Sequence, residues 1–327
     1  RDRRWSCAME GCTTQGMETT PDRGQSHGPV AYHNGQWIDA ASLSVAVDDL
    51  GFEMGLTVVE RLRTFAGRPY CVEQHIARLR RSLEIVDWDA ATLSLEAQQA
   101  IESFADRNAE YMASGDDWAV VAFVTPGPSY AAEAPNLVVH GFPLPFAGWA
   151  RQYREGVRTA VSEVRQTPES CWPPELKCRS RMHYYLADRE AQRRVPGARA
   201  ILLDQRGFVC EASTANVIAF SREDGILTPR LSGVLPGISQ QVLFEIAAEL
   251  DVDHREADMT PRQLADADEV MLTSTSICVL PVVEVDGRPI GSGEPGEFYR
   301  QLLSAWSQRV DVDIAQQAQR FAQRPAK

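Results

Sequence analysis

Between residues 28 and 143 the apolar positions first alternate with polar ones and then recur at helical spacing. The opening runs are short, are broken at His33-Asn34-Gly35 and at Gly67, and predict two pairs of short strands. From residue 72 the apolar side chains are spaced by four and three, which is typical of one helical face. That face consists of Val72, Ile76, Leu79, Leu83 and Val86. The later runs predict a helix over 93–112 and strands over 118–128 and 134–142.

Residues 141–150 interrupt this pattern with two prolines and two glycines in ten positions, which is typical of a linker. Beyond it, short apolar runs and helical spacing alternate again, so a second mixed half is expected. In order, the pattern predicts a strand over 157–166, a helix over 180–194, a hairpin over 198–220 with Gly207 in its turn, a strand over 225–229, a helix within 234–250, and a strand followed by a hairpin over 268–290.

These elements predict a mixed α/β (α+β) chain with two domains. Residues 1–27 are polar and rich in glycine and threonine, without the apolar segment of a secretion signal, and we expect a disordered leader. The expected organisation is a leader over 1–27, a small N-terminal α/β domain over 28–140, a linker over 141–150, a larger domain over 151–310 and a C-terminal tail over 311–327.

Composition and charge narrow the possible functions. The 327-residue chain is 44% hydrophobic and can bury a large core, and its net charge of −12 argues against a general nucleic-acid binder. A local cationic pocket for one small anion stays compatible with that charge. No apolar run approaches the length of a membrane span. The seven cysteines form no CxxC pair and no zinc pattern, so we expect reduced thiols, a cytoplasmic location and no metal site.

One lysine stands out in a chain that otherwise uses arginine. Of the 33 lysines and arginines, only Lys177 and the last residue, Lys327, are lysines. A guanidinium cannot lose its proton near neutral pH, whereas a desolvated ammonium can, and the free amine then attacks carbonyls. Arg179 and Arg181 follow closely and would lower the pKa of the Lys177 amine. Alternatively, arginine has replaced most lysines in this chain for compositional reasons, and Lys177 remains by chance without a chemical role.

Other candidates have ordinary interpretations when each is taken alone. Glu211 lies in an apolar strand and could be part of a salt bridge, and Ser239 near a predicted helix start could be a simple cap. The hydroxyls of residues 273–276 are common at strand ends, and Arg78 could be a solvated helix charge. Together with Lys177, these residues offer an amine for an aldehyde, a carboxylate for a ring nitrogen, and hydroxyls, amides and an arginine for a phosphate. Pyridoxal 5′-phosphate (PLP) needs these groups.

Three motifs then carry a resemblance to a known family. They are E-x-S-x-x-N at 211–216, L-x-G-I-S at 235–239 and the hydroxyl-rich stretch 273–276 ahead of Pro281-Val282. Their order after Lys177 resembles the class IV (fold-type IV) PLP enzymes, which include branched-chain aminotransferases, D-amino-acid aminotransferases and aminodeoxychorismate lyases. The resemblance covers residues 30–305 and implies two domains, the larger one a pseudo-barrel, with the cofactor between them.

The resemblance implies a role for each matching position. Lys177 would form the Schiff base and move a proton, and Glu211 would keep the pyridine nitrogen protonated. The phosphate ligands would be Arg78, Ile238, Ser239, Ser274 and Thr275. The substrate contacts would be Val59, Arg181 and Ser276.

The substrate positions match no single branch of the family. Arg181-Met182 stands where branched-chain enzymes tend to have Asn-Tyr, and Pro126 stands where D-amino-acid enzymes have a substrate arginine. The prediction is a branched-chain-like, PLP-dependent aminotransferase that works by ping-pong between an amino acid and a 2-oxo acid, as a homodimer, without a nucleic-acid or membrane partner. One alternative is an aminodeoxychorismate lyase, which the arginine at position 181 favours. The other is a non-catalytic PLP-binding or oligomeric scaffold protein.

Overall fold

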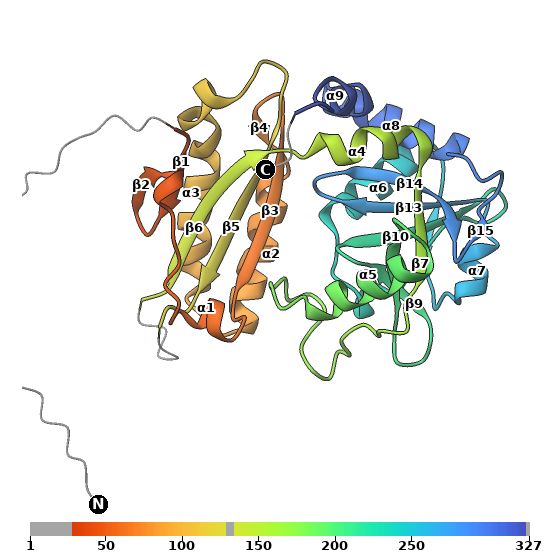
Figure 1. Ribbon diagram of the computed structural model, residues 1–327, viewed down its shortest axis with the longest axis horizontal. Coiled ribbons are helices and arrows are strands. Elements are labelled where there is room, and N and C mark those ends of the chain that lie inside the picture. The colour runs from red at the N-terminus through yellow and green to blue at the C-terminus, as the bar shows by residue number, and fades with distance from the viewer. Residues whose placement is uncertain (1–27, 129–133, 325–327) are drawn as a thin grey trace, which may run out of the picture.

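The computed structural model describes residues 28–128 and 134–324, so the predicted leader over 1–27 lies outside the described part. Figure 1 shows two mixed α/β units side by side, the first in orange to yellow and the second in green to blue. Each unit is built on its own β-sheet. The predicted mixed α/β class with two units is therefore confirmed, although the predicted domain boundaries stay a prediction.

The first unit is an antiparallel sheet in the order β2-β1-β6-β5-β3-β4. Its strands are β1 (Val30–His33), β2 (Gln36–Asp39), β3 (Val58–Phe65), β4 (Arg68–Pro69), β5 (Trp118–Thr125) and β6 (Asn136–Pro143). Its helices are η1 (Ala40–Ser42), α1 (Leu50–Glu53), α2 (Val72–Ile85), α3 (Ala90–Arg107) and η2 (Ala109–Tyr111). The two predicted hairpins and the helix from residue 72 are thus present.

The two faces of the first sheet have different neighbours. Helices α2 and α3 pack on one face, where Val58 and Leu62 of β3 contact Leu79 and their neighbours in a buried cluster. Because side chains alternate along a strand, Val59 and Arg61 of β3 point to the other face. That second face lines a cavity towards the second unit.

The second unit contains a closed ring of six strands, in which β10, β13, β14, β7, β8 and β9 pair in turn and β9 pairs back to β10. Most pairs are antiparallel, but β7 is parallel to both β14 and β8. The ring agrees with the expected pseudo-barrel. The strands of this unit are β7 (Val157–Val161), β8 (Arg199–Leu203), β9 (Val209–Ala212), β10 (Ala215–Ser221), β11 (Gly225–Thr228), β12 (His254–Glu256), β13 (Glu269–Ser274), β14 (Cys278–Val285) and β15 (Arg288–Pro289).

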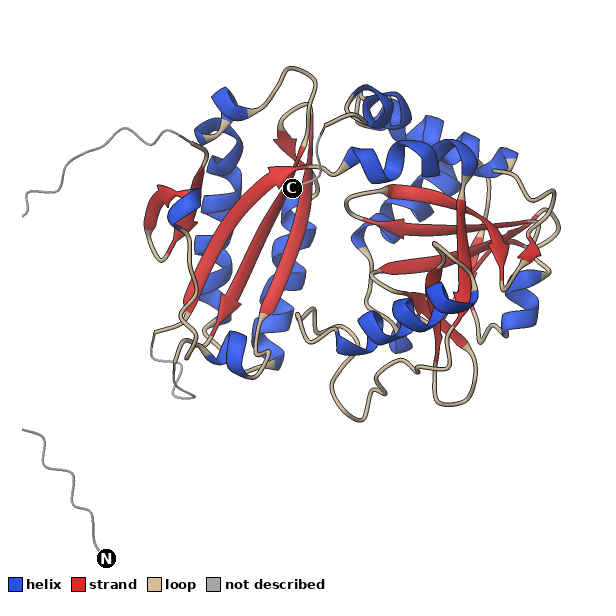
Figure 2. Ribbon diagram, viewed as in Figure 1, coloured by secondary structure: helices blue, strands red, loops and turns tan. Residues whose placement is uncertain are grey.

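Helices surround this barrel, as Figure 2 shows in blue around the red strands. Helix α5 contacts β7 and β8, whereas α6 and α8 contact β13. The helices are α4 (Phe146–Glu155), α5 (Met182–Arg194), η3 (Leu231–Gly233), α6 (Ile238–Glu249), α7 (Pro261–Ala265), α8 (Glu297–Arg309) and α9 (Ile314–Arg320). Within 28–128 and 134–324, no helix has the length and apolar content needed to cross a membrane.

The stretch predicted as one hairpin over 198–220 contains three strands. The chain turns a second time at Ser213 and Thr214, and β9 pairs with β10 through Ala212 and Ala215. Thr214 has a positive φ of 63°, and Arg199 donates to the Ser213 carbonyl at 2.6 Å. A tight turn without glycine has no strong sequence signal, which is why the prediction missed it.

The two stretches predicted as a linker and as a C-terminal tail contain helices. Residues 141–150, the predicted linker, include the end of β6 and the first half of α4. The predicted tail over 311–327 includes α9, whose Ile314 and Ala318 are fully buried. The Gln317 amide donates to Asp117 at 2.7 Å, so α9 joins the second unit to the first.

A buried arginine also connects the two units. Arg63 of β3 is 1% exposed. Its guanidinium donates to the Ser276 carbonyl at 3.1 Å and to the Gln317 side chain at 3.1 Å. A buried charge that is satisfied in this way fixes the position of β3 against the β13–β14 turn.

Candidate active site

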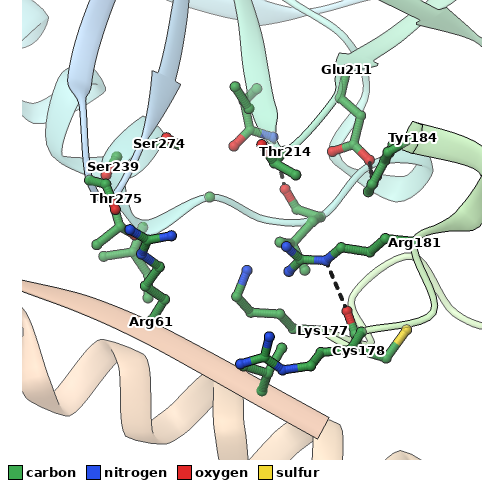
Figure 3. A pocket seen from close by; sticks show the side chains of 18 of the residues that line it. Arg61, Lys177, Cys178, Arg181, Tyr184, Glu211, Thr214, Ser239, Ser274 and Thr275 are labelled. Carbon is green, nitrogen blue, oxygen red and sulfur yellow. Dashed lines mark hydrogen bonds between the residues drawn. The ribbon is translucent and has the colours of Figure 1, made fainter. Parts of the chain in front are cut away.

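One cavity of about 620 Å³ contains residues from both units along its wall. Figure 3 shows Lys177 extending into it, with Glu211 and Tyr184 to one side and Ser239, Ser274 and Thr275 to the other. All ten residues predicted for the site line this cavity: Val59, Arg78, Lys177, Arg181, Glu211, Ile238, Ser239, Ser274, Thr275 and Ser276. The structure therefore brings together positions that are up to 217 residues apart, from Val59 to Ser276.

The segment that carries Lys177 is held against the first sheet. Val59 donates its amide to the Lys177 carbonyl at 3.0 Å, and Arg179 donates its amide to the Thr57 carbonyl at 3.0 Å. The Lys177 amide in turn donates to the Ser82 hydroxyl of α2 at 3.1 Å. These bonds anchor the lysine backbone while its side chain points into the cavity (Figure 3).

The environment of Lys177 favours a neutral amine. Burial and the positive field of Arg78 lower its pKa to about 7, against an opposing effect of Glu60. Arg181 lowers this pKa further, as the sequence predicted, and Glu211 raises it. An amine that is half deprotonated near neutral pH can serve as a nucleophile and as a proton carrier.

Glu211 is a buried carboxylate with two oriented donors. It is 4% exposed at the end of β9, and both the Tyr184 hydroxyl and the Gln166 amide donate to its Oε1. Burial raises the pKa of Glu211, and these two hydrogen bonds oppose the rise. The sequence did not indicate Tyr184 or Gln166. Tyr184 follows Lys177 closely in the chain, which is the one signal that could have pointed to it.

The hydroxyl-rich turn between β13 and β14 is fixed by its neighbours. Thr273 donates to the Cys278 carbonyl at 2.7 Å, and the Tyr153 hydroxyl donates to the Ile277 carbonyl at 2.8 Å. Arg63 on the Ser276 carbonyl adds a further bond to this turn. The hydroxyls of Ser274 and Thr275 thereby face the cavity in a preset arrangement.

The start of α6 lies beside this turn. Gly237 is its N-cap, and in the described structure no side chain caps the first turn. A Cβ at Gly237 would lie 2.0 Å from Asn216 Oδ1, so only glycine fits there. Asn216 also donates to the Leu235 carbonyl at 2.9 Å and holds the preceding loop. The amides of Ile238 and Ser239 thus open a helix at the cavity wall, where a helix favours an anion.

Arg78 belongs to a buried ion cluster that the sequence did not reveal. Its guanidinium donates twice to Glu60, at 2.7 and 2.9 Å, and once to the Pro236 carbonyl, at 2.8 Å. His75 lies 2.8 Å from Glu60. Opposite charges and hydrogen bonds overcome burial and hold the pKa of Glu60 well below its usual range. The cluster orients Arg78 towards the loop that leads into α6, and its remaining N–H groups are available to an anion.

The cavity also contains basic side chains that were not predicted. Arg61 and His140 reach it from β3 and β6, and Arg179 from the segment after Lys177. Arg181 is held by a bond from its Nε to the Cys178 carbonyl at 3.1 Å. The alternation of β3 could have identified Arg61, because it lies two residues from Val59 on the same face. His140 had no comparable signal.

The donor set fits PLP group by group. Lys177 is an amine for the aldehyde, Glu211 is an oriented carboxylate for the ring nitrogen, and the α6 amides with the neighbouring hydroxyls suit a phosphate. Within the described ranges, no group of three or more histidine, cysteine, aspartate or glutamate side chains could hold a metal ion.

Comparison with known proteins agrees with this site. The family model for the amino-transferase class IV matches residues 57–285, which is more than half of the chain. A D-alanine aminotransferase of Bacillus licheniformis is 24% identical over 288 residues, covering 86% of this chain and 97% of the relative. A putative branched-chain-amino-acid aminotransferase of Methanocaldococcus jannaschii is 28% identical over 284 residues, covering 83% and 93%.

Solved structures have the same fold. A branched-chain amino acid aminotransferase of T.th., solved with pyridoxamine 5′-phosphate, superposes with a TM-score of 0.79 at 23% identity, covering 88% of this chain and 95% of that one. The Escherichia coli branched-chain amino acid aminotransferase gives a TM-score of 0.74 at 21% identity, covering 85% and 93%. At these identities the likeness establishes the two-unit fold.

Proposed function

The chain belongs to the class IV aminotransferase family, as its motifs predicted, and from that premise we propose how its site works. It transfers an amino group from an amino acid to a 2-oxo acid by ping-pong, as a branched-chain-aminotransferase-like enzyme. The observation that carries the proposal is that Lys177 and Glu211 line one cavity with a phosphate-type cluster. An amine, a carboxylate and an anion site in this combination match one cofactor.

The cofactor of the family is PLP, and it is the cofactor of this chain. When bound, PLP supplies an aldehyde that exchanges with amino groups and a ring that takes up the electron pair left at the substrate Cα. Lys177 would hold the aldehyde and Glu211 the ring nitrogen. Arg78, Ile238, Ser239, Ser274 and Thr275 would hold the phosphate, as the motif positions predict.

Lys177 is the proton carrier in this proposal. With a pKa of about 7, the amine can take up the proton that leaves the substrate Cα and release it again during the same half-reaction, without a large cost in either direction. The bonds to Val59 and Ser82 fix its backbone, so only the side chain moves.

Glu211 stabilises a positive charge on the group that it faces. Tyr184 and Gln166 both donate to Oε1, so Oε2 is the oxygen that would accept a hydrogen bond from a proton-bearing nitrogen. Its buried position strengthens that charge interaction, because the local dielectric is low.

An aminotransferase is favoured over the two alternatives. The curated relatives are named as aminotransferases, whereas Arg181 in the cavity is the one feature that points to an aminodeoxychorismate lyase. A purely scaffolding role would give no reason for the lowered pKa of Lys177.

The test uses purified holoenzyme with amino acids of both configurations. Transfer predicts conversion of the cofactor absorbance from the aldehyde to the amine form with a donor alone, and return with a 2-oxo acid. Lys177→Ala should abolish both changes. Pyruvate released from aminodeoxychorismate without a 2-oxo acid would establish the lyase instead, and no spectral change with any donor would support the scaffold.

We also infer a homodimer in the cytoplasm. Phe52 and Leu56 near α1 are 72% and 36% exposed, and Met182 and Tyr185 of α5 are 69% and 62% exposed. The Ser180 hydroxyl donates to the Gly55 carbonyl at 2.9 Å, so these apolar side chains belong to neighbouring segments. Exposed apolar surface of this kind suits a subunit contact. Light scattering should give a dimer mass that Phe52→Glu lowers towards the monomer.

A further inference from the structure

Two side chains beside Glu211 have no role in the site as described so far. Tyr184 of α5 and Gln166, which lies in the connection after β7, both line the cavity wall and both donate to Glu211 Oε1. Figure 3 shows the bond from Tyr184. The Gln166 amide also lies 3.4 Å from the Tyr184 hydroxyl, so the three side chains form one compact polar group.

The surroundings fix the direction of both hydrogen bonds. The oxygen of the Gln166 side chain accepts from the Thr167 amide at 2.9 Å, so the NH2 group is the one turned to Glu211. The Gln166 carbonyl accepts from the Gln205 side chain at 2.9 Å, which holds the residue in place. Burial and the charge of Glu211 raise the pKa of Tyr184 well above its ordinary value, so the phenol keeps its proton and stays a donor.

The charge of Glu211 depends on these two donors. Burial raises the pKa of Glu211, because a buried carboxylate loses its hydration. The hydrogen bond from Tyr184 is the largest effect that opposes this rise, followed by the bond from Gln166 and by the charge of Lys177. Tyr184 therefore contributes most to keeping Glu211 negative, since a donor stabilises a carboxylate more than a neutral carboxyl group.

The other groups around Glu211 do not replace these donors. The Leu235 amide lowers the pKa of Glu211 through a further hydrogen bond, which is a smaller effect. In the sheet, Glu211 pairs with Leu202 of β8 and Asn216 of β10, and neither side chain is ionisable. The pKa of the adjacent Cys210 is raised to about 12, so this thiol is neutral near pH 7.

Tyr184 also connects Glu211 with the segment that carries the reacting amine. Lys177 and Tyr184 are seven positions apart, and α5 begins directly after Arg181. The charge of Arg181 acts on both Lys177 and Tyr184. The His183 ring contacts the Tyr184 ring at 4.0 Å, and burial lowers the pKa of His183, so this neighbour is mostly uncharged near pH 7. The start of α5 thus places the amine and the main partner of the carboxylate on one short segment.

We propose that Tyr184 and Gln166 are positioning residues, which keep Glu211 ionised and oriented so that the proton shared with the cofactor stays on the ring nitrogen. The inference deepens the proposed aminotransferase and rests on it. Without these donors, the buried carboxylate would take the proton itself and leave the ring nitrogen neutral. A neutral ring takes up the electron pair from the substrate less readily, because it lacks the positive charge.

The first test reads the protonation of the ring nitrogen directly. The holoenzyme is prepared with PLP that is isotopically labelled at the ring nitrogen, and NMR reports whether this nitrogen carries a proton. We expect a protonated nitrogen in the wild type at pH 7 and a shift towards the unprotonated signal in Tyr184→Phe. Gln166→Met should shift the signal in the same direction by a smaller amount, because Tyr184 has the larger effect on Glu211.

The kinetics should follow the nitrogen signal. In Tyr184→Phe we expect kcat of the first half-reaction to fall by about tenfold and KM to change by less than about twofold, because the lost bond acts on the ring and not on substrate binding. Tyr184 and Gln166 lie on different segments, so a folding defect in one variant leaves the other available for the test.

Tyr32→Phe is the matched control. The Tyr32 hydroxyl donates to Glu96 Oε1 at 2.7 Å, so the substitution removes the same kind of bond. Both Tyr32 and Glu96 lie outside the cavity wall. The nitrogen signal and kcat should therefore stay as in the wild type, and equal changes in Tyr32→Phe and Tyr184→Phe would contradict the inference.

A second measurement needs no cofactor. Infrared spectroscopy of the full chain without PLP detects the carbonyl band of a protonated carboxyl group, and the band that disappears in Glu211→Gln belongs to Glu211. We expect the pH at which Glu211 is half protonated to be higher in Tyr184→Phe than in the wild type by about one unit or more, because a hydrogen bond to a charged group is lost.

The possible outcomes separate this inference from the proposed function. An unchanged nitrogen signal with an unchanged infrared midpoint in Tyr184→Phe and Gln166→Met would overturn the inference and leave the aminotransferase intact. A neutral ring nitrogen in the wild-type holoenzyme would do the same. Absence of a half-reaction with any donor would instead refute the proposed function, while the infrared midpoint would still show whether Tyr184 keeps Glu211 ionised.

Discussion

The basicity of Lys177 is the property on which the chemistry depends, and it can be measured directly. Burial and Arg78 bring its pKa to about 7. At pH 7 about half of the Lys177 side chains are then neutral, compared with fewer than about one in a thousand for a lysine of pKa about 10.4. The reaction of Lys177 with an acylating reagent should therefore reach half of its maximal rate near pH 7.

The perturbation is Arg78→Met, which removes the largest electrostatic cause of the lowered pKa and leaves the opposing charge of Glu60 in place. We expect the pH at which acylation of Lys177 reaches half of its maximal rate to rise by about one unit or more. Arg80→Gln is the control, because Arg80 lies on the same helix but is exposed and paired with Glu84. Arg80→Gln should leave the pH midpoint of Lys177 acylation unchanged.

The assay is competitive acylation of cofactor-free protein at a series of pH values, with added Nα-acetyl-lysine as the reference. Lys327 is the only other lysine, so mass spectrometry of peptides separates the two sites. A midpoint near pH 10 in the wild type, or no change in Arg78→Met, would refute the reasoning.

The same pKa predicts a pH dependence of stability. Between pH about 7 and about 10.4 the unfolded chain keeps a proton on Lys177 that the folded chain has lost. The unfolded state therefore binds more protons, and the contribution of Lys177 to the free energy of unfolding rises with pH across this window. In urea unfolding, the difference between the wild type and Lys177→Met should change in that direction, and a flat difference would contradict the assignment.

Three further substitutions test other parts of the site. Glu211→Gln keeps the shape of the side chain but removes its charge, so the rate of the first half-reaction should fall on the order of a hundredfold while the cofactor stays bound, as measured by absorbance. Arg63→Met leaves the Ser276 carbonyl and Gln317 without their buried donor, and urea unfolding should show a loss of about 3 kcal/mol; a loss below about 1 kcal/mol would argue against its bridging role. Gly237→Ala places a Cβ 2.0 Å from Asn216 Oδ1 and should weaken cofactor binding about tenfold by displacing the start of α6, whereas Gly233→Ala, where a Cβ meets nothing within 4 Å, should not.

The sequence by itself determined the types of element and the types of chemistry. The spacing of four and three from Val72 to Val86 predicted a helix that the structure places over Val72–Ile85. The single internal lysine and the apolar strand around Glu211 indicated an amine and a carboxylate, and the three motifs indicated the family. These features are local, so they can be read along the chain.

Tertiary structure decided which of these groups meet. The alternation of side chains along β3 predicts that Val59 and Arg61 lie on the same face of the sheet. That this face lines the cavity is decided by tertiary packing, because α2 and α3 cover the opposite face. The ion cluster of Glu60, His75 and Arg78 and the anchoring of Lys177 on β3 likewise join distant segments. Contacts of this kind depend on sheet register and on how the two units pack, and neither leaves a periodic signal in the sequence.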